Sequence, residues 1–408
     1  MSDEKFENGE TEQLDPIEEE YKLALSYLEG YGVEQDYVKA DELFCKLLEK
    51  MKEHYGKDHI NTASTYYVIG GSYGKHENYE KALFYYKNAL SIYKKNYNKH
   101  HDITDTLSFI ADCYEELTDY KEAVKYYKDA LASNEELNGK DNENTAIYYN
   151  RISFCYESLK EYQNALNYNL KALAIRERVL GTEHEDTAYV YNKIADNYFN
   201  QKDFKNALIY YEKAYKAYKI IYVNENFETN NSCYSVAVCY EEMGEYEKAL
   251  SYYEETLNGY EKIHGKEHSY TAATNLSIAG CHYNLNNYEK ALEYDLTALE
   301  IYEKIFEEDA SEISLSYNNT GTDYRTLGKY EEALKYHLKA LELRKKYCQV
   351  KDYIAFSFKN AGKDYEAKGD MENANKYYKE SLSIYESLEG FDSDVEELRE
   401  FVKRTGSN

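Results

Sequence analysis

The chain has 408 residues, of which 31% are charged, and its 76 acidic residues against 49 basic ones give a formal net charge of −27. This balance argues against nucleic acid and anionic membranes as partners, because both attract basic surfaces, and it favours a basic or mixed-charge protein segment, although an acidic excess also serves solubility alone. Proline occurs once and tyrosine 51 times, and the scarcity of proline indicates an almost wholly helical chain.

Residues 1–15 are acidic, and we expect them to be disordered. The first residues lack the basic and apolar regions of a signal peptide. No apolar run in the sequence approaches the ~20 residues that cross a bilayer. Seven cysteines without a C-x-x-C pair fit reduced thiols. We therefore expect a cytoplasmic protein.

Residues 16–56 predict a helical hairpin. Its glycine-rich centre, with Gly30 and Gly32 between Tyr27 and Ala40, marks a turn between two helices. The segment looks like a Sel-like repeat, a helical hairpin with such a turn. We expect it to pack against the unit that follows.

An alanine recurs every 41 or 42 residues along almost the whole chain. The sequence around it is nearly constant, as in Tyr-Glu-Lys-Ala-Leu at 79–83 and Tyr-Glu-Glu-Ala-Leu at 330–334. A period of this length means that one supersecondary unit is copied and stacked, which predicts a solenoid. These anchor alanines are Ala40, Ala82, Ala123, Ala165, Ala207, Ala249, Ala291, Ala333 and Ala374.

Positions that follow the anchor define the second helix of each unit. From Ala82 onward a tyrosine stands three residues after it, a small residue seven after it, and an apolar or aromatic residue eight after it. Spacings of three, four, seven and eight place these side chains on one helical stripe. The tyrosines are Tyr85, Tyr126, Tyr168, Tyr210, Tyr252, Tyr294, Tyr336 and Tyr377.

Positions that precede the anchor define the first helix. Twelve residues before it lies a small residue, which lets two helices approach closely, and three residues after that small residue lies a tyrosine, with His282 as the exception. The small residues are Gly70, Ala111, Ser153, Ala195, Ala237, Ala279, Gly321 and Gly362. A short polar step such as Gly328-Lys329 forms the turn between the two helices.

A second recurring sequence pattern separates the repeat units. Gly56, Gly139, Gly181 and Gly265 each follow a predicted helix end, and a Thr-Ala pair opens the next first helix. Glycine there suits a left-handed C-terminal cap. Spacers around 224–227, 307–311 and 347–352 lack this pattern, so their geometry is left open.

The alternation of Tyr-x-x-Ala-Leu-x-Tyr-Tyr with Gly-x-x-His-x-x-Thr-Ala resembles tetratricopeptide repeats, in the 42-residue form seen in kinesin light chains and related bacterial proteins. The match covers residues 57–390 as eight units. The resemblance implies an all-α, right-handed superhelical solenoid of antiparallel helix hairpins. Residues 391–408 predict a capping helix and tail, because Val395, Leu398 and Val402 have helical spacing and a stacked array needs a polar outer face at its end.

The cysteines and histidines that could form a chemical site recur at fixed positions of the repeat. Cysteines recur two residues after the small first-helix residue, as in Cys113 and Cys155, which indicates packing. His59, His184 and His268 occupy equivalent spacer positions, with His101 as a fourth, and positions in different repeats do not converge on one metal. No phosphate loop, nucleophile elbow or zinc-protease motif occurs in the sequence. We therefore predict no enzymatic activity, no metal and no cofactor.

In proteins that this chain resembles, first helices line a concave surface that contacts a peptide. Residues at equivalent first-helix positions are therefore candidates, and asparagines suit the role because an amide both donates and accepts hydrogen bonds. The alternative is ordinary surface polarity without a ligand. The candidates are Tyr67, Asp112, Asn150, Asn192, Asp196, Tyr234, Glu241, Asn318, Asn319 and Arg325.

Two functions stay open. The first is a non-catalytic scaffold or adaptor that binds a peptide segment or helix of a partner in its concave groove. The second is a bacterial peptide-sensing regulator of the tetratricopeptide type, which usually carries an additional N-terminal effector domain. The abundance of lysine, asparagine and tyrosine favours a bacterial source.

Overall fold

The computed structural model of the protein describes residues 16–222, 226–306 and 311–405. The acidic segment 1–15, which the sequence predicts to be disordered, lies outside these residues, as do parts of two of the unusual spacers.

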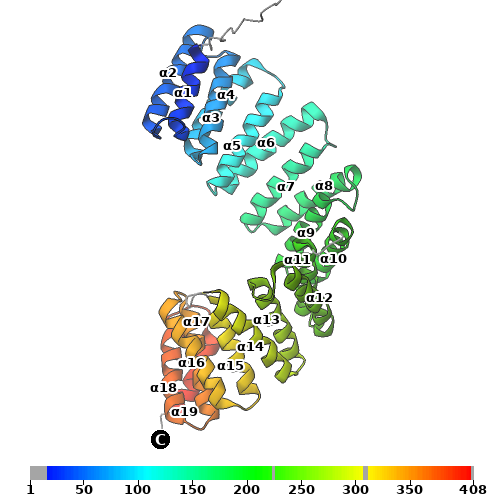
Figure 1. The fold of residues 1–408 in the computed structure, drawn as a ribbon, viewed down its shortest axis with the longest axis vertical. Helices are drawn as coiled ribbons and strands as arrows, with labels where there is room; N and C mark the ends of the chain where they lie inside the picture. The colour runs from blue at the N-terminus through cyan, green and yellow to red at the C-terminus, as the bar shows by residue number, and fades with distance from the viewer. Residues whose placement is uncertain (1–15, 223–225, 307–310, 406–408) are drawn as a thin grey trace, which may run out of the picture. The chain divides into compact units, whose positions relative to one another are not determined.

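The described residues form 19 α-helices and no strand (Figure 1). The helices are α1 (Pro16–Glu29), α2 (Tyr37–Tyr55), α3 (Ile60–Lys75), α4 (Tyr79–Asn96), α5 (His101–Glu116), α6 (Tyr120–Asn138), α7 (Glu143–Ser158), α8 (Tyr162–Val179), α9 (Glu185–Asn200), α10 (Phe204–Ile221), α11 (Phe227–Glu242), α12 (Tyr246–His264), α13 (Ser269–Asn284), α14 (Tyr288–Ile305), α15 (Ser311–Thr326), α16 (Tyr330–Tyr347), α17 (Lys351–Ala367), α18 (Met371–Tyr385) and α19 (Asp392–Thr405).

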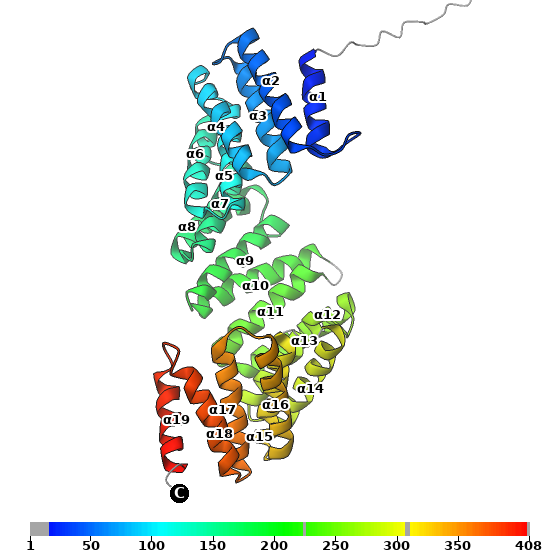
Figure 2. The same ribbon diagram turned by 90° about the vertical axis from the view of Figure 1, so that its left-hand side faces the viewer.

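The helices fall into two compact units, residues 1–181 with α1–α8 and residues 182–408 with α9–α19. In both of these compact units, each odd-numbered helix from α1 to α17 is the first helix of a hairpin and packs against the even-numbered second helix that follows it. Inside each of the two compact units, a second helix also packs against the next first helix, for example α4 against α5 and α14 against α15. Figure 2 shows these successive hairpins from a second side. The chain is an all-α solenoid of helix hairpins, as the period predicts.

Small side chains bring the helices of each hairpin together. All nine anchor alanines are fully buried. Where the first helix carries glycine, the contact leaves no room for a methyl group: a Cβ on Gly70 would lie 2.9 Å from the ring of Tyr86, and one on Gly362 would lie 2.8 Å from the ring of Tyr378. Burial of these positions therefore sets the spacing of the pairs.

The two recurring tyrosine positions meet inside each hairpin. The first-helix tyrosine packs against the second-helix tyrosine in seven of the eight units, with ring centroids between 5.1 Å for Tyr365–Tyr377 and 5.9 Å for Tyr198–Tyr210. In the sixth unit His282 takes the first-helix place and packs against Tyr294 with ring centroids 5.7 Å apart. Such ring pairs add to the stabilisation from burial and explain the high tyrosine content.

The glycines that end second helices adopt a positive φ, but not the predicted left-handed helical cap. Gly56, Gly139 and Gly265 have φ of 101°, 80° and 88° with ψ of 152°, 172° and 174°, whereas the left-handed helical region has ψ near +47°. This extended positive-φ region is almost restricted to glycine. It directs the chain away from the helix into the spacer, so the residue type was predicted correctly and the cap conformation was wrong.

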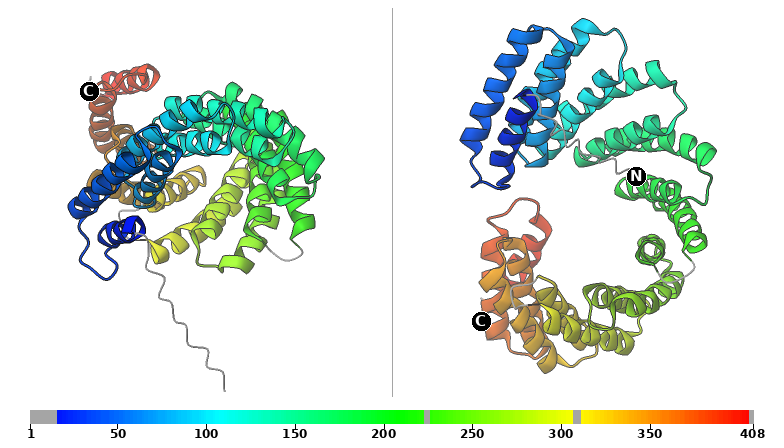
Figure 3. Two further views of the ribbon diagram at one scale, coloured as in Figure 1. Left: turned by 90° about the horizontal axis from the view of Figure 1, so that it is seen from above. Right: turned by 45° about the horizontal axis from the view of Figure 1, so that its top comes forward.

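The ends of the array also contain helices. Residues 16–29 and 37–55 form the hairpin α1–α2, in which Leu28 and Phe44 are fully buried. At the other end α19 packs on α18 through Leu398, which is 1% exposed, and through Val395 and Phe401. Figure 3 shows α17, α18 and α19 as the last helices of the second unit. The assignment of α1–α2 to the Sel-like type stays a prediction.

Candidate functional site

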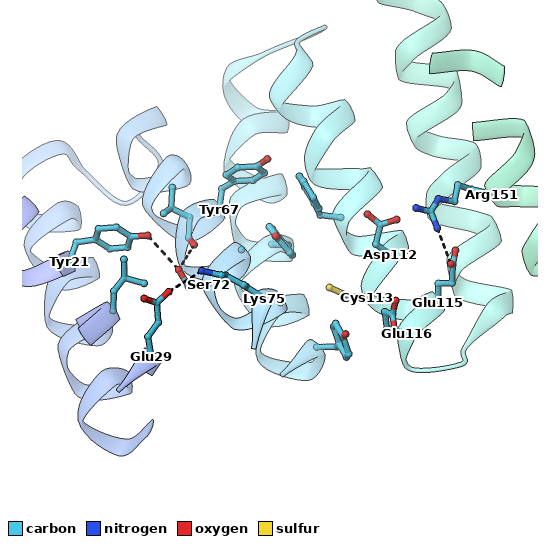
Figure 4. Close-up of a pocket in the computed structure, with 17 residues that line it drawn as sticks. Tyr21, Glu29, Tyr67, Ser72, Lys75, Asp112, Cys113, Glu115, Glu116 and Arg151 are labelled. Carbon is cyan, nitrogen blue, oxygen red and sulfur yellow. Dashed lines mark hydrogen bonds and ion pairs between the residues drawn. The ribbon is translucent and has the colours of Figure 1, made fainter. Parts of the chain in front are cut away.

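A cavity of about 710 Å³ lies along the first helices of the unit formed by residues 1–181 (Figure 4). It crosses four consecutive first helices, α1, α3, α5 and α7, and takes two tyrosines from α4. The residues that line it are Tyr21, Leu25, Glu29, Tyr67, Val68, Gly71, Ser72, Gly74, Lys75, Tyr79, Tyr86, Phe109, Asp112, Cys113, Glu115, Glu116 and Arg151.

Three aromatic rings form an apolar part of this cavity. Phe109 stacks on Tyr86 with ring centroids 5.6 Å apart, and Tyr67 contacts both rings edge-on. Phe109 and Val68 are 39% and 41% exposed, so part of this apolar surface faces solvent. Rings held in this way offer a partner a rigid contact area that loses little conformational entropy on binding.

The polar part of the cavity is acidic. Four carboxylates and two cations line it, and each cation already pairs with a carboxylate: Lys75 Nζ lies 3.2 Å from Glu29 Oε1, and Arg151 Nη1 lies 3.2 Å from Glu115 Oε1 (Figure 4). The other two carboxylates, Asp112 and Glu116, give the lining its negative excess. A basic group brought by a partner would complement it.

Burial perturbs the groups that face this cavity. Desolvation raises the pKa of the Asp112 carboxyl, although Tyr127 Oη donates a hydrogen bond to Asp112 Oδ1 at 2.5 Å, which opposes that rise. Desolvation likewise raises the pKa of Glu115. It raises the pKa of the Tyr67 hydroxyl to about 12, so this hydroxyl stays protonated at neutral pH.

The predicted contact residues of this unit lie on or beside the cavity. Tyr67 and Asp112 line it directly. Asn150 lies on α7 next to Arg151, and its side chain is half-buried. Its Oδ1 is buried and accepts no hydrogen bond from the described residues, so this amide retains an acceptor.

The predicted residues of α9 and α11 are half-buried and hydrogen-bonded to their own hairpin or to the next one. Asn192 Nδ2 donates to Ser232 Oγ at 3.1 Å, and Tyr234 Oη lies 2.9 Å from Ser277 Oγ. Asp196 and Glu241 accept hydrogen bonds from second-helix tyrosines, namely Tyr211 Oη at 2.6 Å and Tyr253 Oη at 2.5 Å. These side chains keep part of their surface exposed, while Asp196 and Glu241 are held by their own hairpin and Asn192 and Tyr234 by the next one.

The three C-terminal candidates have different surroundings. Asn318 is only 6% exposed, and its Oδ1 accepts a hydrogen bond from Asn360 Nδ2 at 2.8 Å. Arg325 Nη1 lies 3.2 Å from Asp364 Oδ1, and this carboxylate also bonds to the buried imidazole of His337. Asn319 instead lines a second, smaller cavity. The structure thus places Asn318 and Arg325 in an internal network.

The residue four places after each anchor alanine was not predicted from the sequence to be functional. Where the small residue of the first helix is glycine, this residue lies against it. It is tyrosine in five of the eight units. The signal was its three polar replacements, Asn169, Asp295 and His337. His337 replaces an aromatic residue of the period, and neither it nor Asp295 was predicted to be functional.

The recurring cysteines and histidines have structural roles in the described residues. Cys113, Cys155, Cys239 and Cys281 are buried, and burial raises the pKa of each thiol to about 12. His59, His184 and His268 cap first helices by accepting a backbone N–H at Nδ1. His100 provides the fourth cap, so the prediction of His101 was off by one residue.

The described ranges contain neither a metal-binding cluster nor a membrane-spanning helix. Among residues 16–222, 226–306 and 311–405, no three His, Cys, Asp or Glu side chains come together in a way that could hold a metal ion. In the same ranges, none of the helices combines the length and apolar character of a membrane span.

Solved structures with a similar fold include three that align over most of this chain. The apo form of RapI shares 16% identity over 85% of this chain and 97% of that chain, with a TM-score of 0.56. A signal transduction ATPase with a tetratricopeptide repeat sensor from Pyrococcus horikoshii shares 20% identity over 81% of this chain and 48% of that one, with a TM-score of 0.55. Aspartyl phosphate phosphatase F from Bacillus subtilis shares 16% identity over 90% and 92%, with a TM-score of 0.52.

At these identities the likeness is one of fold. A comparison with curated proteins finds no match. The tetratricopeptide repeat family, in contrast, matches residues 31–95, 102–178, 147–220, 229–304, 270–346 and 312–387. The chain belongs to the tetratricopeptide repeat family.

Proposed function

We propose that this protein is a non-catalytic scaffold or adaptor that binds a segment of a partner protein along the first helices of its repeats. The observation that carries the proposal is the cavity of about 710 Å³ that runs across α1, α3, α5 and α7. Solenoids of this kind present extended surfaces to partners, and a cavity with aromatic and polar walls is the usual form of a binding site.

The chemistry of the cavity favours a basic or mixed-charge segment that also carries an apolar side chain. Phe109, Tyr86 and Tyr67 supply an aromatic surface for the apolar side chain. Asp112 and Glu116 supply negative charge that neither Lys75 nor Arg151 offsets by a direct ion pair. Complementary charge of this kind sets orientation and association rate.

Asn150 extends the proposed contact surface to α7. Its half-buried amide suits a backbone contact with an extended segment, because such a contact does not depend on the segment's sequence. In the other unit we assign partner contacts to Asn192, Asp196, Tyr234, Glu241 and Asn319. Asn318 and Arg325 stabilise that surface through their internal hydrogen-bond network. We place the protein in the cytoplasm.

A pair of photo-crosslinking variants tests the proposal. Phe109 on α5 lines the cavity, whereas Phe84 on α4 is 61% exposed and does not line it. Replacing either phenylalanine with benzoylphenylalanine keeps the aromatic character. We expect the Phe109 variant to crosslink one defined segment of a partner in cells of the native host, and the Phe84 variant not to do so.

A charge reversal adds a second arm. Glu116→Lys should abolish the crosslink from Phe109, since it turns the excess of negative charge in the cavity into a balance. Equal crosslinking from both phenylalanines, or crosslinking that survives Glu116→Lys unchanged, would show that partners bind another face.

A further inference from the structure

A second cavity, of about 210 Å³, lies in the unit formed by residues 182–408 and contains two buried carboxyl groups. Asp295 of α14 and Asp323 of α15 are 4% and 2% exposed and both line it. Its rim comes from the first helices α13 and α15, where Asn284 is exposed and Asn319 is half-buried. The cavity is therefore reached from the first-helix face of this unit.

The two carboxyl groups lack the partners that buried acids normally have. The two carboxyl groups repel each other when both are charged, and the charge of Asp323 helps to raise the pKa of Asp295. Asp295 Oδ1 and Asp323 Oδ2 have no hydrogen-bond partner among the described residues. Buried polar atoms are nearly always bonded in folded proteins, so two unbonded carboxyl oxygens that line a cavity indicate a missing group.

At the equivalent positions one repeat later, the buried carboxylate has its bonding partners. Asp364 lies two residues after the small residue of its first helix, as Asp323 does. His337 lies four residues after its anchor alanine, as Asp295 does. In that repeat Asp364 bonds to His337 and to the guanidinium of Arg325, with Arg325 Nη1 3.2 Å from Asp364 Oδ1. One carboxylate is thus held by an imidazole and a cation.

One repeat earlier the same three positions contain no cation. The place of Arg325, four residues after the small residue of the first helix, is taken by Tyr283, and the place of His337 is taken by Asp295. Tyr283 Oη lies 3.3 Å from Thr326 Oγ1, and its side chain lines the cavity. The positions that bind a guanidinium around Asp364 therefore contain two acidic residues and a cavity one repeat earlier.

We propose that this cavity receives a basic side chain, an arginine guanidinium or a lysine ammonium, from the partner segment, which pairs with Asp295 and Asp323. This proposal rests on the proposed function and names one side chain of its ligand. A planar guanidinium with several N–H donors satisfies both carboxyl groups at once. The volume is several times the ~30 Å³ that a water molecule occupies in the liquid, so the end of a side chain fits.

The local electrostatics agree with this occupant. Burial, reinforced by Asp323, raises the pKa of Asp295 well above its ordinary value, and burial raises the pKa of Asp323 to about 6. The other titratable groups nearby are Tyr283 in the lining and Glu241 of α11, whose Oε1 would lie 3.7 Å from a Cβ on Gly280 of the lining. His337 of α16 lies behind Thr322 and is bonded to Asp364. A bound cation would favour the ionised form of both carboxyl groups.

The test uses the full chain and paired peptides. The two peptides of a pair are nonapeptides with the same randomised sequence and differ only at the central residue. This residue is arginine in one peptide and citrulline, its neutral isostere, in the other. A third peptide carries lysine at the same place. We expect wild-type protein to bind the arginine peptides at least about tenfold more tightly than the citrulline ones, since a hydrogen-bonded charge pair is worth this much. Asp323→Asn should abolish the preference. Glu342→Gln, an equal charge change at an exposed site on α16, should keep it.

A variant that supplies the cation from its own side chain provides an independent test. Tyr283→Arg places a guanidinium at the position that Arg325 holds one repeat later. We expect it to raise the melting temperature and to block the arginine peptides, and we expect Tyr283→Phe to do neither. A Tyr283→Arg variant that melts no higher than wild type would overturn the proposal, because the cavity would then not accommodate this cation.

Three other results would also overturn it. Citrulline and arginine peptides could bind equally well, which would leave the scaffold function standing without this contact. Calcium ions alone could raise the melting temperature through Asp323 while arginine peptides do not, which would make the cavity a metal site. Failure of all peptides to bind would remove the contact, and the crosslinks from Phe109 would then decide the scaffold function separately.

Discussion

Single residues at the turns inside the hairpins carry a conformational cost that the repeat tolerates. Five residues before the anchor alanine, φ is positive in all eight units. Glycine takes this place at Gly244, Gly328 and Gly369, but Thr118 and Lys160, among others, have φ of 60° and 59°. A side chain in this region costs about 1–2 kcal/mol, and β-branched residues are rare in it.

Thr118→Gly should therefore stabilise the unit formed by residues 1–181. Thr118 is exposed in the turn between α5 and α6, so its side chain contributes little packing. The gain from relieving the backbone exceeds the entropy that glycine adds to the unfolded chain, and we expect the free energy of unfolding to rise by about 0.5–1 kcal/mol. Urea denaturation followed by circular dichroism measures the difference.

The reverse change is the control. A Cβ on Gly328, in the equivalent turn between α15 and α16, would meet no atom within 4 Å, so Gly328→Thr tests the backbone alone. It should lower the free energy of unfolding by about 1–2 kcal/mol. If Thr118→Gly instead lowers stability, the threonine makes a contact that outweighs its backbone strain.

At the scale of the helix, four histidines replace the usual oxygen caps at first-helix N-termini. His268 Nδ1 accepts the backbone N–H of Tyr270 at 3.2 Å, at the start of α13. Desolvation, together with the nearby His264, lowers the pKa of His268. A protonated imidazole cannot accept this bond, so the folded state favours the neutral ring.

The sign of the resulting pH dependence follows from linkage. Because the folded pKa lies below the ordinary value, the contribution of His268 is complete above pH ~6.5 and is lost as the pH falls through the lowered pKa. His268→Asn should keep the cap without titrating. We expect the wild type to lose about 0.5–1 kcal/mol more stability than this variant between pH 7.5 and pH 5.

The measurement compares urea midpoints of the two proteins at both pH values. Asp323 titrates in the opposite sense, since its raised pKa makes stability fall as the pH rises through the interval between its ordinary value and about 6. That effect is common to both proteins and cancels in the comparison. Equal pH-dependent losses in the wild type and in His268→Asn would mean that His268 contributes no titrating cap.

Contacts within a hairpin were predictable from sequence, whereas contacts between hairpins were not. The spacing of anchor alanines and tyrosines repeats eight times, so each unit confirms the helical stripe read from the others. Asn318 was assigned to the surface, but Asn360 of α17, two helices further on, covers it and bonds to its Oδ1. Likewise, the spacing of Asp295 within its own unit says nothing of Asp323. Such pairs depend on how neighbouring units are rotated, which the period does not fix.

At the scale of the whole molecule, each repeat depends mainly on its neighbours, so the last hairpin depends on α19. Lys359 of α17 has a side chain that is 8% exposed, and its Nζ lies 2.7 Å from Asp394 Oδ1 of α19. Phe401 packs edge-on against Tyr378 of α18 with centroids 4.3 Å apart. We therefore predict that α19 acts as the cap of the array.

A chain that ends at Gly390 tests this prediction by hydrogen exchange. Removing α19 exposes Tyr378 and Tyr385 and leaves the buried Lys359 without its carboxylates, a loss of at least about 2 kcal/mol for the adjoining hairpin. Amides of α17 and α18 should then exchange at least about tenfold faster. Because coupling in a solenoid passes from neighbour to neighbour, the effect should decline through α15–α16 and vanish at α9–α10. Equal acceleration from α9 to α18 would instead mean that the eleven helices of residues 182–408 open as one cooperative body, in which α19 stabilises distant repeats as strongly as its own neighbour.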